Sequence, residues 1–276
     1  MPHKASIRIA VLRLGIHRTT TAGGLLAHLR IATWNLERPK LNGQTKNSRR
    51  LEKIREVDAD LWVLTETNST ITLDGYASLA SEGQHGYHST GENFATIWSR
   101  WPICRRLPTF DAFFTVCAEV NSPAGPMVVF GTIITYANDR GLNGTARRWE
   151  EHRKSIEAHA ADWDRLRKEF PDHLFCVAGD FNQSRHRSGW YEDAESVKKL
   201  TSALDRSSLL CVTEDDMRAK GLLQSRASID HVCLSQSLAT QVVAVGAWEG
   251  TTVDGRRMSD HNGIVVDINT RPSTAR

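Results

Sequence analysis

The sequence predicts a layered α/β domain in which two β-sheets pack against each other. The chain has 276 residues and is 40% apolar, which is enough for one large domain with a full core. From Leu29 onward, short β-branched apolar runs alternate with longer amphipathic stretches, the pattern of an α/β fold. About ten such runs are more than one flat open sheet usually holds, so we expect two packed sheets.

The expected strands share β-branched apolar residues bounded by turn signals. They are 30–34, 60–65, 94–98, 114–120, 127–135, 173–178, 208–213, 229–234, 242–247 and 263–268. Helical spacing of apolar residues predicts helices over 47–56, 145–169 and 193–205. Asn143 and Thr145 are candidate caps for the second helix, and Pro171 should end it. The irregular segments 81–93 and 249–259 are expected to shape a site.

No internal repeat or Pro/Gly/Ser-rich linker divides the chain, so residues 30–270 are expected to form one domain. Residues 1–29 are expected to be a disordered basic tail, and residues 271–276 a C-terminal tail. Arg8, Arg13 and Arg18 interrupt the apolar stretch near the N-terminus, which argues against a signal peptide.

The net charge of +3 comes from the N-terminal segment. Its four bases, Lys4, Arg8, Arg13 and Arg18, leave 31 bases against 32 acids, so residues 30–276 sum to −1. The body therefore lacks a general charge excess for binding polyanions. The five scattered cysteines form no C-x-x-C pair, which is typical of buried thiols in a reducing, cytoplasmic setting.

Polar clusters stand where predicted strands end. They are Thr33-Trp34-Asn35, Leu64-Thr65-Glu66-Thr67, Gly179-Asp180-Phe181-Asn182 and Ser259-Asp260-His261-Asn262, with Ile229-Asp230-His231 at a strand start. Taken singly, the amides and aspartates can be explained as turn caps. A Glu that closes a buried strand, however, needs a partner or a cation. Strand ends hold side chains rigidly and leave them facing solvent, so one shared site for a cation explains all the clusters.

These clusters resemble the endonuclease/exonuclease/phosphatase superfamily in both sequence and order. The matching motifs are IATWN (31–35), LWVLTE (61–66), ATIWSRWPI (95–103), VAGDFN (177–182), SIDHVCLS (228–235) and SDHNGIVV (259–266). The resemblance runs from about Arg30 to Ile268. It implies a four-layer α/β/β/α sandwich, with two mostly antiparallel mixed sheets inside, and a catalytic domain over residues 30–270 that hydrolyses phosphate esters with a divalent metal.

The resemblance also implies the ligands of that metal. Glu66 matches the main carboxylate ligand, and Asn35 and Asp260 match neighbours in or just outside its shell. Carboxylate and amide oxygens without thiolate suit Mg²⁺ or Mn²⁺ rather than zinc.

The catalytic roles follow in the same way. His261 resembles the active-site histidine, oriented by Asp230, and Asp180 resembles the aspartate that handles the attacking water. Asn182 matches the amide that steadies this aspartate and the phosphoryl oxygen. Which of Asp180 and His261 is the general base stays open at this stage.

Two positions depart from the family pattern. Thr65 stands where a glutamine usually precedes the metal-binding glutamate. Tyr136 stands where deoxyribonucleases and phosphatases usually have a histidine and abasic-site endonucleases a tyrosine. Tyr136 therefore indicates the abasic-endonuclease branch and is a candidate catalytic residue. A tyrosine in a strand is, however, also a common core residue.

Arginines and tryptophans near the motifs suggest substrate contacts. Arg185 and Arg187 follow GDFN, and Arg256 and Arg257 precede SDH, where guanidinium groups can bind phosphate. Trp190 or Trp248 can stack a base, or pack beneath these loops. Arg49 and Arg50 are expected on an exposed helix face.

We therefore expect a monomeric phosphodiesterase, a nuclease rather than a phosphatase, with nucleic acid as its substrate partner and no membrane contact. The alternatives are a phosphomonoesterase, a phosphodiesterase for lipid or inositol headgroups, or a catalytically silent binding module. The complete residue set argues against the last.

Overall fold

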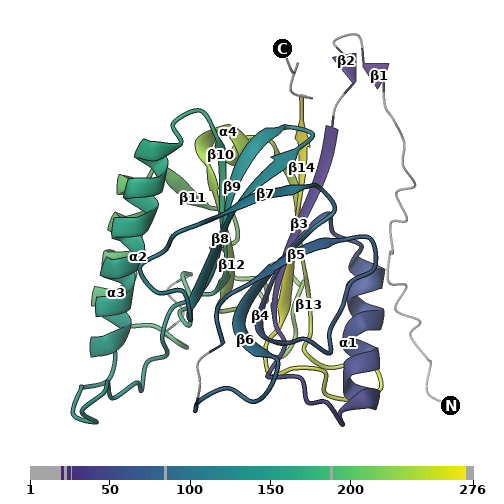
Figure 1. Cartoon of the computed structure of the whole chain (residues 1–276). Helices are drawn as coiled ribbons and strands as arrows, with labels where there is room; N and C mark the ends of the chain where they lie inside the picture. Colours follow the sequence, from purple (N-terminus) through teal and green to yellow (C-terminus); the bar gives the residue numbers. More distant parts are fainter. Residues whose placement is uncertain (1–19, 22–23, 26, 84–85, 187–188, 272–276) are drawn as a thin grey trace, which may run out of the picture.

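Two six-stranded sheets pack face to face, with helices on both outer sides (Figure 1). The computed structural model describes residues 20–21, 24–25, 27–83, 86–186 and 189–271. In sheet order, the first sheet is β13 (Val242–Trp248), β14 (Gly263–Thr270), β3 (Ala27–Asn35), β4 (Leu61–Asn68), β6 (Glu92–Ser99) and β5 (Ala77–Ala80). The second is β11 (Leu209–Cys211), β12 (Asp230–Ser235), β10 (Leu174–Asp180), β9 (Gly125–Ile133), β8 (Thr115–Ser122) and β7 (Ile103–Leu107). The predicted four-layer sandwich is confirmed.

The strand directions bring the motif residues to one edge. β3 runs parallel to β4, and β9 runs parallel to β10, whereas the other described neighbours in the two sheets are antiparallel. The ends of β3, β4 and β10 and the starts of β12 and β14 consequently meet at the same end of the sandwich.

Three apolar layers hold the sandwich together. β-branched and aliphatic residues, such as Ile31 and Val129, alternate along the strands and fill the space between the sheets. Helices α2 (Glu150–Glu169) and α3 (Ala194–Arg206) cover the second sheet, and Trp163 packs there with Phe130. Helix α1 (Gln44–Val57) covers the first sheet over Trp34 and Trp62. The short helix α4 (Gln236–Ala239) follows β12.

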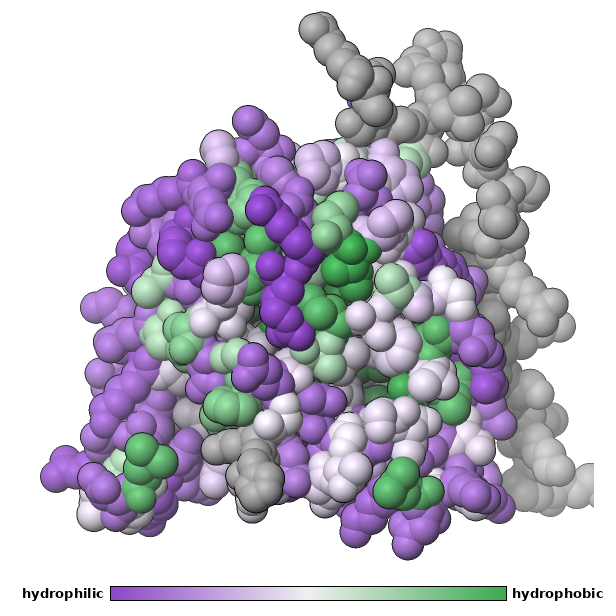
Figure 2. Space-filling model, in the orientation of Figure 1, coloured by the Kyte–Doolittle hydropathy of each residue, from purple (hydrophilic) through white to green (hydrophobic). Residues whose placement is uncertain are grey.

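All ten predicted strands are present, and the two strands missed in these sheets lie at sheet edges. β5 and β7 present mostly exposed or half-exposed residues, so their sequences lack a buried apolar run. The face seen in Figure 2 is mostly hydrophilic, with apolar residues in small separate groups. Among the described residues, no helix is both long and apolar enough to cross a membrane.

The second helix begins later than predicted. α2 starts at Glu150, and neither Asn143 nor Thr145 caps it. Trp149 precedes the helix with a φ of 69°, and its N–H donates to the Ala137 carbonyl at 2.7 Å. This tertiary contact outweighs the helical spacing of residues 145–149. The third helix is as predicted, because the Asp193 side chain accepts from the backbone of Glu195 and Ser196 and caps α3.

The predicted tail boundary is three residues late. Ala27 already pairs with Thr270 of β14, and Leu29 is fully buried, so residues 27–29 belong to the sheet. Of the residues before them, Thr20–Thr21 (β1) pairs with Gly24–Leu25 (β2), and residues 1–19 lie outside the described part of the chain.

Candidate active site

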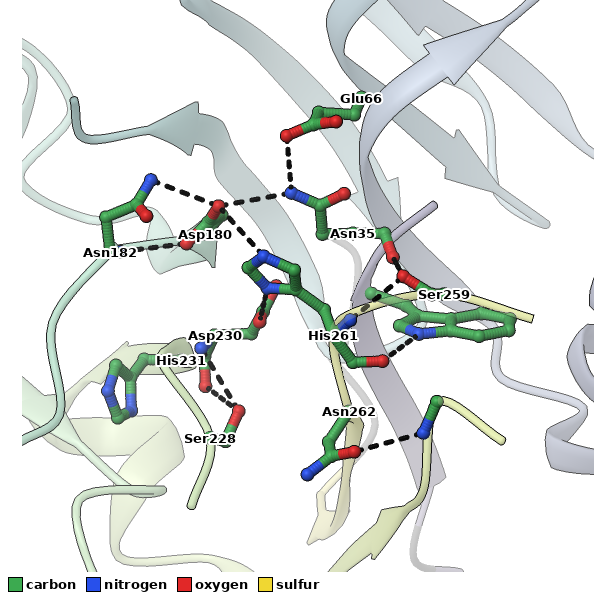
Figure 3. Close-up of polar contacts among 12 residues, drawn as sticks. Asn35, Glu66, Asp180, Asn182, Ser228, Asp230, His231, Ser259, His261 and Asn262 are labelled. Carbon is green, nitrogen blue, oxygen red and sulfur yellow. Dashed lines mark hydrogen bonds and ion pairs between the residues drawn. The ribbon is translucent and has the colours of Figure 1, made fainter. Parts of the chain in front are cut away.

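Asp180 is almost completely enclosed in the site (Figure 3). It ends β10, is 1% exposed, and accepts from the backbone N–H of Asn182 at 2.8 Å and from the Asn35 side chain at 3.1 Å. The preceding Gly179 is required, because a Cβ there would lie 2.0 Å from the Thr132 carbonyl oxygen. Burial raises the pKa of Asp180 to about 7, although nearby His261 opposes this shift.

His261 and Asp230 form a tight pair beside Asp180. The Nδ1 atom of His261 donates to Asp230 Oδ2 at 2.7 Å, and its Nε2 lies 3.9 Å from Asp180 Oδ2. Burial alone would lower the pKa of His261, but the charges of Asp230 and Asp180 raise it to about 10. The ring is therefore an imidazolium at neutral pH, held by the carboxylate that fixes its orientation.

Asn35 links the two sheets. It ends β3 and is fully buried, and its Nδ2 donates both to Glu66 Oε1 at 3.0 Å and to Asp180 Oδ2 at 3.1 Å. The hydroxyl of Ser259 donates to its backbone carbonyl at 2.5 Å, which ties the SDH loop to β3. A single amide thus sets the spacing between the acids of the two sheets.

Glu66 occupies a strained position in β4. Its φ is 47°, in the left-handed region that non-glycine residues rarely adopt. Burial raises its pKa, and the hydrogen bond from Asn35 and the charge of His261 only partly offset this. Asp260 adds to the same shift, so the two acids are close enough to repel each other. A cation would relieve this excess negative charge.

The known families decide what kind of site this is. A scan against them matches residues 32–261 to the Endonuclease/Exonuclease/phosphatase family. The chain belongs to the Endonuclease/Exonuclease/phosphatase family. A search of the curated proteins gives no match.

Solved structures share the fold. The 3′ phosphatase NExo from Neisseria, bound to a product DNA hairpin, aligns with a TM-score of 0.63 and 16% identity, over 87% of this chain and 99% of that one. An AP endonuclease from Archaeoglobus fulgidus gives 0.63 and 14%, over 86% and 98%. The endonuclease domain of TRAS1, a telomere-specific non-LTR retrotransposon, gives 0.58 and 17%, over 90% and 100%. At these identities, the likeness establishes the fold.

Membership of the Endonuclease/Exonuclease/phosphatase family makes this chain a phosphoester hydrolase that depends on a divalent metal. The donor set fits such an ion at Glu66, because Glu66 and Asp260 offer hard oxygen atoms and no thiolate. Asn35 turns its amide nitrogen toward Glu66, and its Oδ1 accepts from the Glu37 N–H at 2.8 Å. Asp180, Asp230 and His261 have ligand atoms within 4.8 Å of one another, but their internal ion pairs and the cationic ring suit proton handling better than metal binding.

The expectation that strand-end side chains face solvent is wrong for half of the site. Asn35, Asp180 and Asp230 are at most 1% exposed, because they point between the two packed sheets. Asp260 is 46% exposed and remains open to ligands. Burial removes water competition from the hydrogen bonds of the enclosed residues.

The predicted phosphate-binding arginines differ in placement. Arg185 turns inward, with a side chain only 6% exposed and bonded to Thr201 of α3, so it is not the solvent-facing contact that we expected. Arg187 lies outside the described residues. Arg256 is exposed and pairs with Asp254 at 2.9 Å. Arg257 pairs with Glu37 and approaches Asp260 at 3.7 Å, so it does border the site.

The predicted aromatic residues also differ in their placement. Trp248 is buried against Trp34 and Trp62, with ring centroids 5.6 and 6.0 Å apart, so it supports the core. Trp190 is exposed. Tyr136 lies in the loop after β9 and is 52% exposed, so it is neither in a strand nor a core residue.

Two residues that border the site, Arg50 and Glu37, were not predicted from the sequence. Arg50 was expected on an exposed helix face, but it is buried and donates to the Met258 and Glu37 carbonyls at 2.8 and 3.3 Å. It thereby holds both loops that border Asp260. Burial lowers its pKa to about 10. The sequence signal for Glu37 was its position, because it is the first acid after IATWN and follows Asn35 by two residues.

Proposed function

We propose that this chain is a Mg²⁺- or Mn²⁺-dependent phosphodiesterase that cleaves nucleic acid by attack of water on a backbone phosphate. One observation carries the proposal: Asp180, His261 and Asp230 form a connected, buried group, and the Asn35 amide nitrogen links Asp180 to the carboxylate oxygen of Glu66. The DNA hairpin bound to the similar 3′ phosphatase, and the names of the similar endonucleases, support a nucleic-acid substrate.

The pKa shifts favour Asp180 as the general base. Burial raises the pKa of Asp180 to about 7, which suits a group that takes a proton from water near neutral pH. His261, with a pKa of about 10, is already protonated and cannot accept that proton. We infer that His261 instead stabilises the charge that develops on the phosphoryl oxygens.

The remaining residues position these groups. The backbone N–H and the side-chain amide of Asn182 both donate to Asp180 and hold it in place. The backbone of Asn182 has a φ of 47°, in the left-handed region. Asp230 keeps the His261 ring oriented and charged. A metal ion held by Glu66, with Asn35 and Asp260 beside it, would polarise the phosphate and neutralise its charge.

The test is a substrate panel assayed with Mg²⁺ or Mn²⁺. It contains plasmid DNA, single-stranded DNA, an abasic-site duplex, RNA, inositol phosphates and phospholipid vesicles. We expect cleavage of nucleic-acid diesters and none by Asp180→Asn protein purified in parallel. Release of phosphate from terminal monoesters alone would favour the phosphomonoesterase, and activity confined to headgroups would favour the lipid or inositol enzyme.

We further propose that residues 27–270 form the catalytic domain and act as a monomer in a reducing compartment such as the cytoplasm. Cys117, Cys176, Cys211 and Cys233 are buried free thiols, which fits such a compartment, and Cys104 is exposed.

A further inference from the structure

Two arginine–aromatic pairs stand at the site end of the sandwich. The Arg38 guanidinium lies over the Tyr87 ring, 5.0 Å from its centroid, and the Arg226 guanidinium lies 5.8 Å from the centroid of Trp190. Both rings are unusually exposed for aromatic side chains, at 55% for Tyr87 and 40% for Trp190. Exposed aromatic rings with an arginine guanidinium packed against them are the usual platforms for stacking nucleic-acid bases.

The Arg38–Tyr87 pair borders the proposed metal ligand. The backbone N–H of Arg38 donates to the Glu66 carbonyl at 3.1 Å, and its φ is a strained 45°. Its Nη2 atom donates to Glu92 at 2.7 Å and to the Tyr87 carbonyl at 3.2 Å, which fixes the pair. A hollow of about 270 Å³ opens between Glu66, Tyr87 and Phe94. This hollow is slightly smaller than a drug-sized ligand pocket, which suits one ring system.

The Arg226–Trp190 pair borders the proton relay. The carbonyl of Arg226 accepts from the Asn262 side chain at 2.9 Å, directly after His261 in the chain. The Trp190 ring packs against Tyr191, with centroids 5.9 Å apart, and the Tyr191 hydroxyl accepts from the backbone of Ala137. This pair is thus anchored to the loops that surround Asp180 and His261.

The two pairs lie on opposite flanks of the site. Glu66 belongs to β4, and the Tyr87 loop leads into β6 on the side of the first sheet away from β14. The Arg226 loop leads into β12, which packs against β14 and β3. In Figure 3 Glu66 and Asn262 accordingly stand at opposite ends of the cluster, with Asp180 and His261 between them.

The charge of the chain favours a single strand over a duplex. Residues 30–276 sum to −1, whereas duplex binding normally depends on several basic phosphate contacts. Arg38 is already neutralised by Glu92. Stacking, by contrast, needs unpaired bases and little charge. We propose that Tyr87–Arg38 and Trp190–Arg226 stack bases on either side of the cleaved phosphate, an inference that rests on the proposed function. Single-stranded nucleic acid is then the substrate class.

The proposal is tested by binding, in the Asp180→Asn background with Mg²⁺ and by fluorescence anisotropy. The probes are an oligothymidylate of about eight nucleotides and an equally long backbone of base-free tetrahydrofuran nucleotides. We expect the base-containing strand to bind roughly 5- to 150-fold more tightly for each platform used. Tyr87→Ala and Trp190→Ala should each lower this preference, and the double variant should abolish it. Tyr87→Phe should retain it.

Phe110→Ala is the matched control, because Phe110 is an exposed aromatic that packs on His159 and carries no arginine among the described residues. It should keep the full preference. Three results would overturn the proposal. The two strands could bind equally tightly, or Phe110→Ala could lose as much of the base preference as the platform variants. A hairpin duplex could also bind more tightly than the single strand, with an affinity that the platform variants do not change. Base-dependent binding without cleavage by the parent would refute the hydrolysis and support the platforms. Cleavage without base dependence would refute the platforms alone.

Discussion

The two sheets contribute unlike halves of the site. The half from β10 and β12 holds Asp180 and Asp230, which are almost completely buried and ion-paired with His261. The half from β4 and the β13–β14 loop holds Glu66 and Asp260, which repel each other. The hydrogen bond from Asn35 and the charge of His261 only partly offset the raised pKa of Glu66, and the exposed Arg257 lies 3.7 Å from Asp260. The buried half is therefore held by its own ion pairs, whereas the other half carries excess negative charge that a cation would offset.

Backbone strain follows the same division. On the open half, Glu37, Arg38 and Glu66 have φ values of 53°, 45° and 47°, whereas Asn182 is the strained residue beside Asp180. Each such residue costs about 1–3 kcal/mol, which the surrounding structure must offset. Strain concentrated around the proposed ligands fits a site whose geometry is set for an ion rather than for its own hydrogen bonds.

The largest effect should come from the buried half. Asp180→Asn and His261→Ala should each lower turnover by roughly 10²–10⁴-fold, the usual scale for acid–base groups. Metal affinity should change little, because neither residue is a proposed ligand. Turnover and metal titrations measured on the same variants test this division. A variant that loses metal binding as strongly as turnover would show that the halves are not separate.

Glu66→Gln should mainly affect the open half. EDTA should abolish activity and Mg²⁺ or Mn²⁺ should restore it, but the variant should need at least about 10-fold more metal for half activity. Glu82→Gln, an exposed acid at the same end, is the control and should titrate like the parent. Identical metal titrations of Glu66→Gln and the parent would remove Glu66 from the ligand set.

Acid should destabilise the second sheet through His159. Burial lowers the pKa of His159 to about 4, below its ordinary value of 6.5. The stability is therefore full above about pH 6.5 and is lost progressively as the pH falls from about 6.5 to about 4, because the unfolded chain binds the proton first. The raised pKa of Asp180 acts in the opposite direction, so the comparison must be with a variant. Between pH 7 and pH 5, urea denaturation should show the stability gap between the parent and His159→Gln narrowing by about 2 kcal/mol. A stability gap that stays constant over this pH range would show that His159 does not carry the effect.

The smallest effect concerns the arginines of the β13–β14 loop. Arg257 borders Asp260 and Glu37, whereas Arg256 pairs with Asp254, so only Arg257→Ala should weaken polymer binding. Its loss should flatten the dependence of log affinity on log salt by about 0.7–0.9, the contribution of one phosphate contact. Salt titrations of both single variants measure this. Equal salt dependence of binding for the parent and Arg257→Ala would show that Arg257 forms a structural ion pair and does not contact phosphate.

Most of the fold was predictable because its signals are local. Buried strands such as β4 and β9 are continuous apolar runs, and α3 begins at its capping residue, Asp193. The edge strands β5 and β7 were missed because an exposed strand has no such run. The start of α2 was missed because a contact between Trp149 and Ala137 outweighs helix spacing.

By itself, the sequence determined which residues gather at the candidate site, since Asn35, Glu66, Asp180, Asp230 and His261 stand in short motifs that end or begin strands. Only the tertiary structure decided which way the side chains face. Arg185 and Arg257 both sit beside a motif, yet one is buried against α3 and the other borders the ligands. A local pattern specifies where a strand ends, but exposure and pKa depend on which surface packs against that end. That surface comes from residues more than a hundred positions away, as Asn35 and Asp180 show.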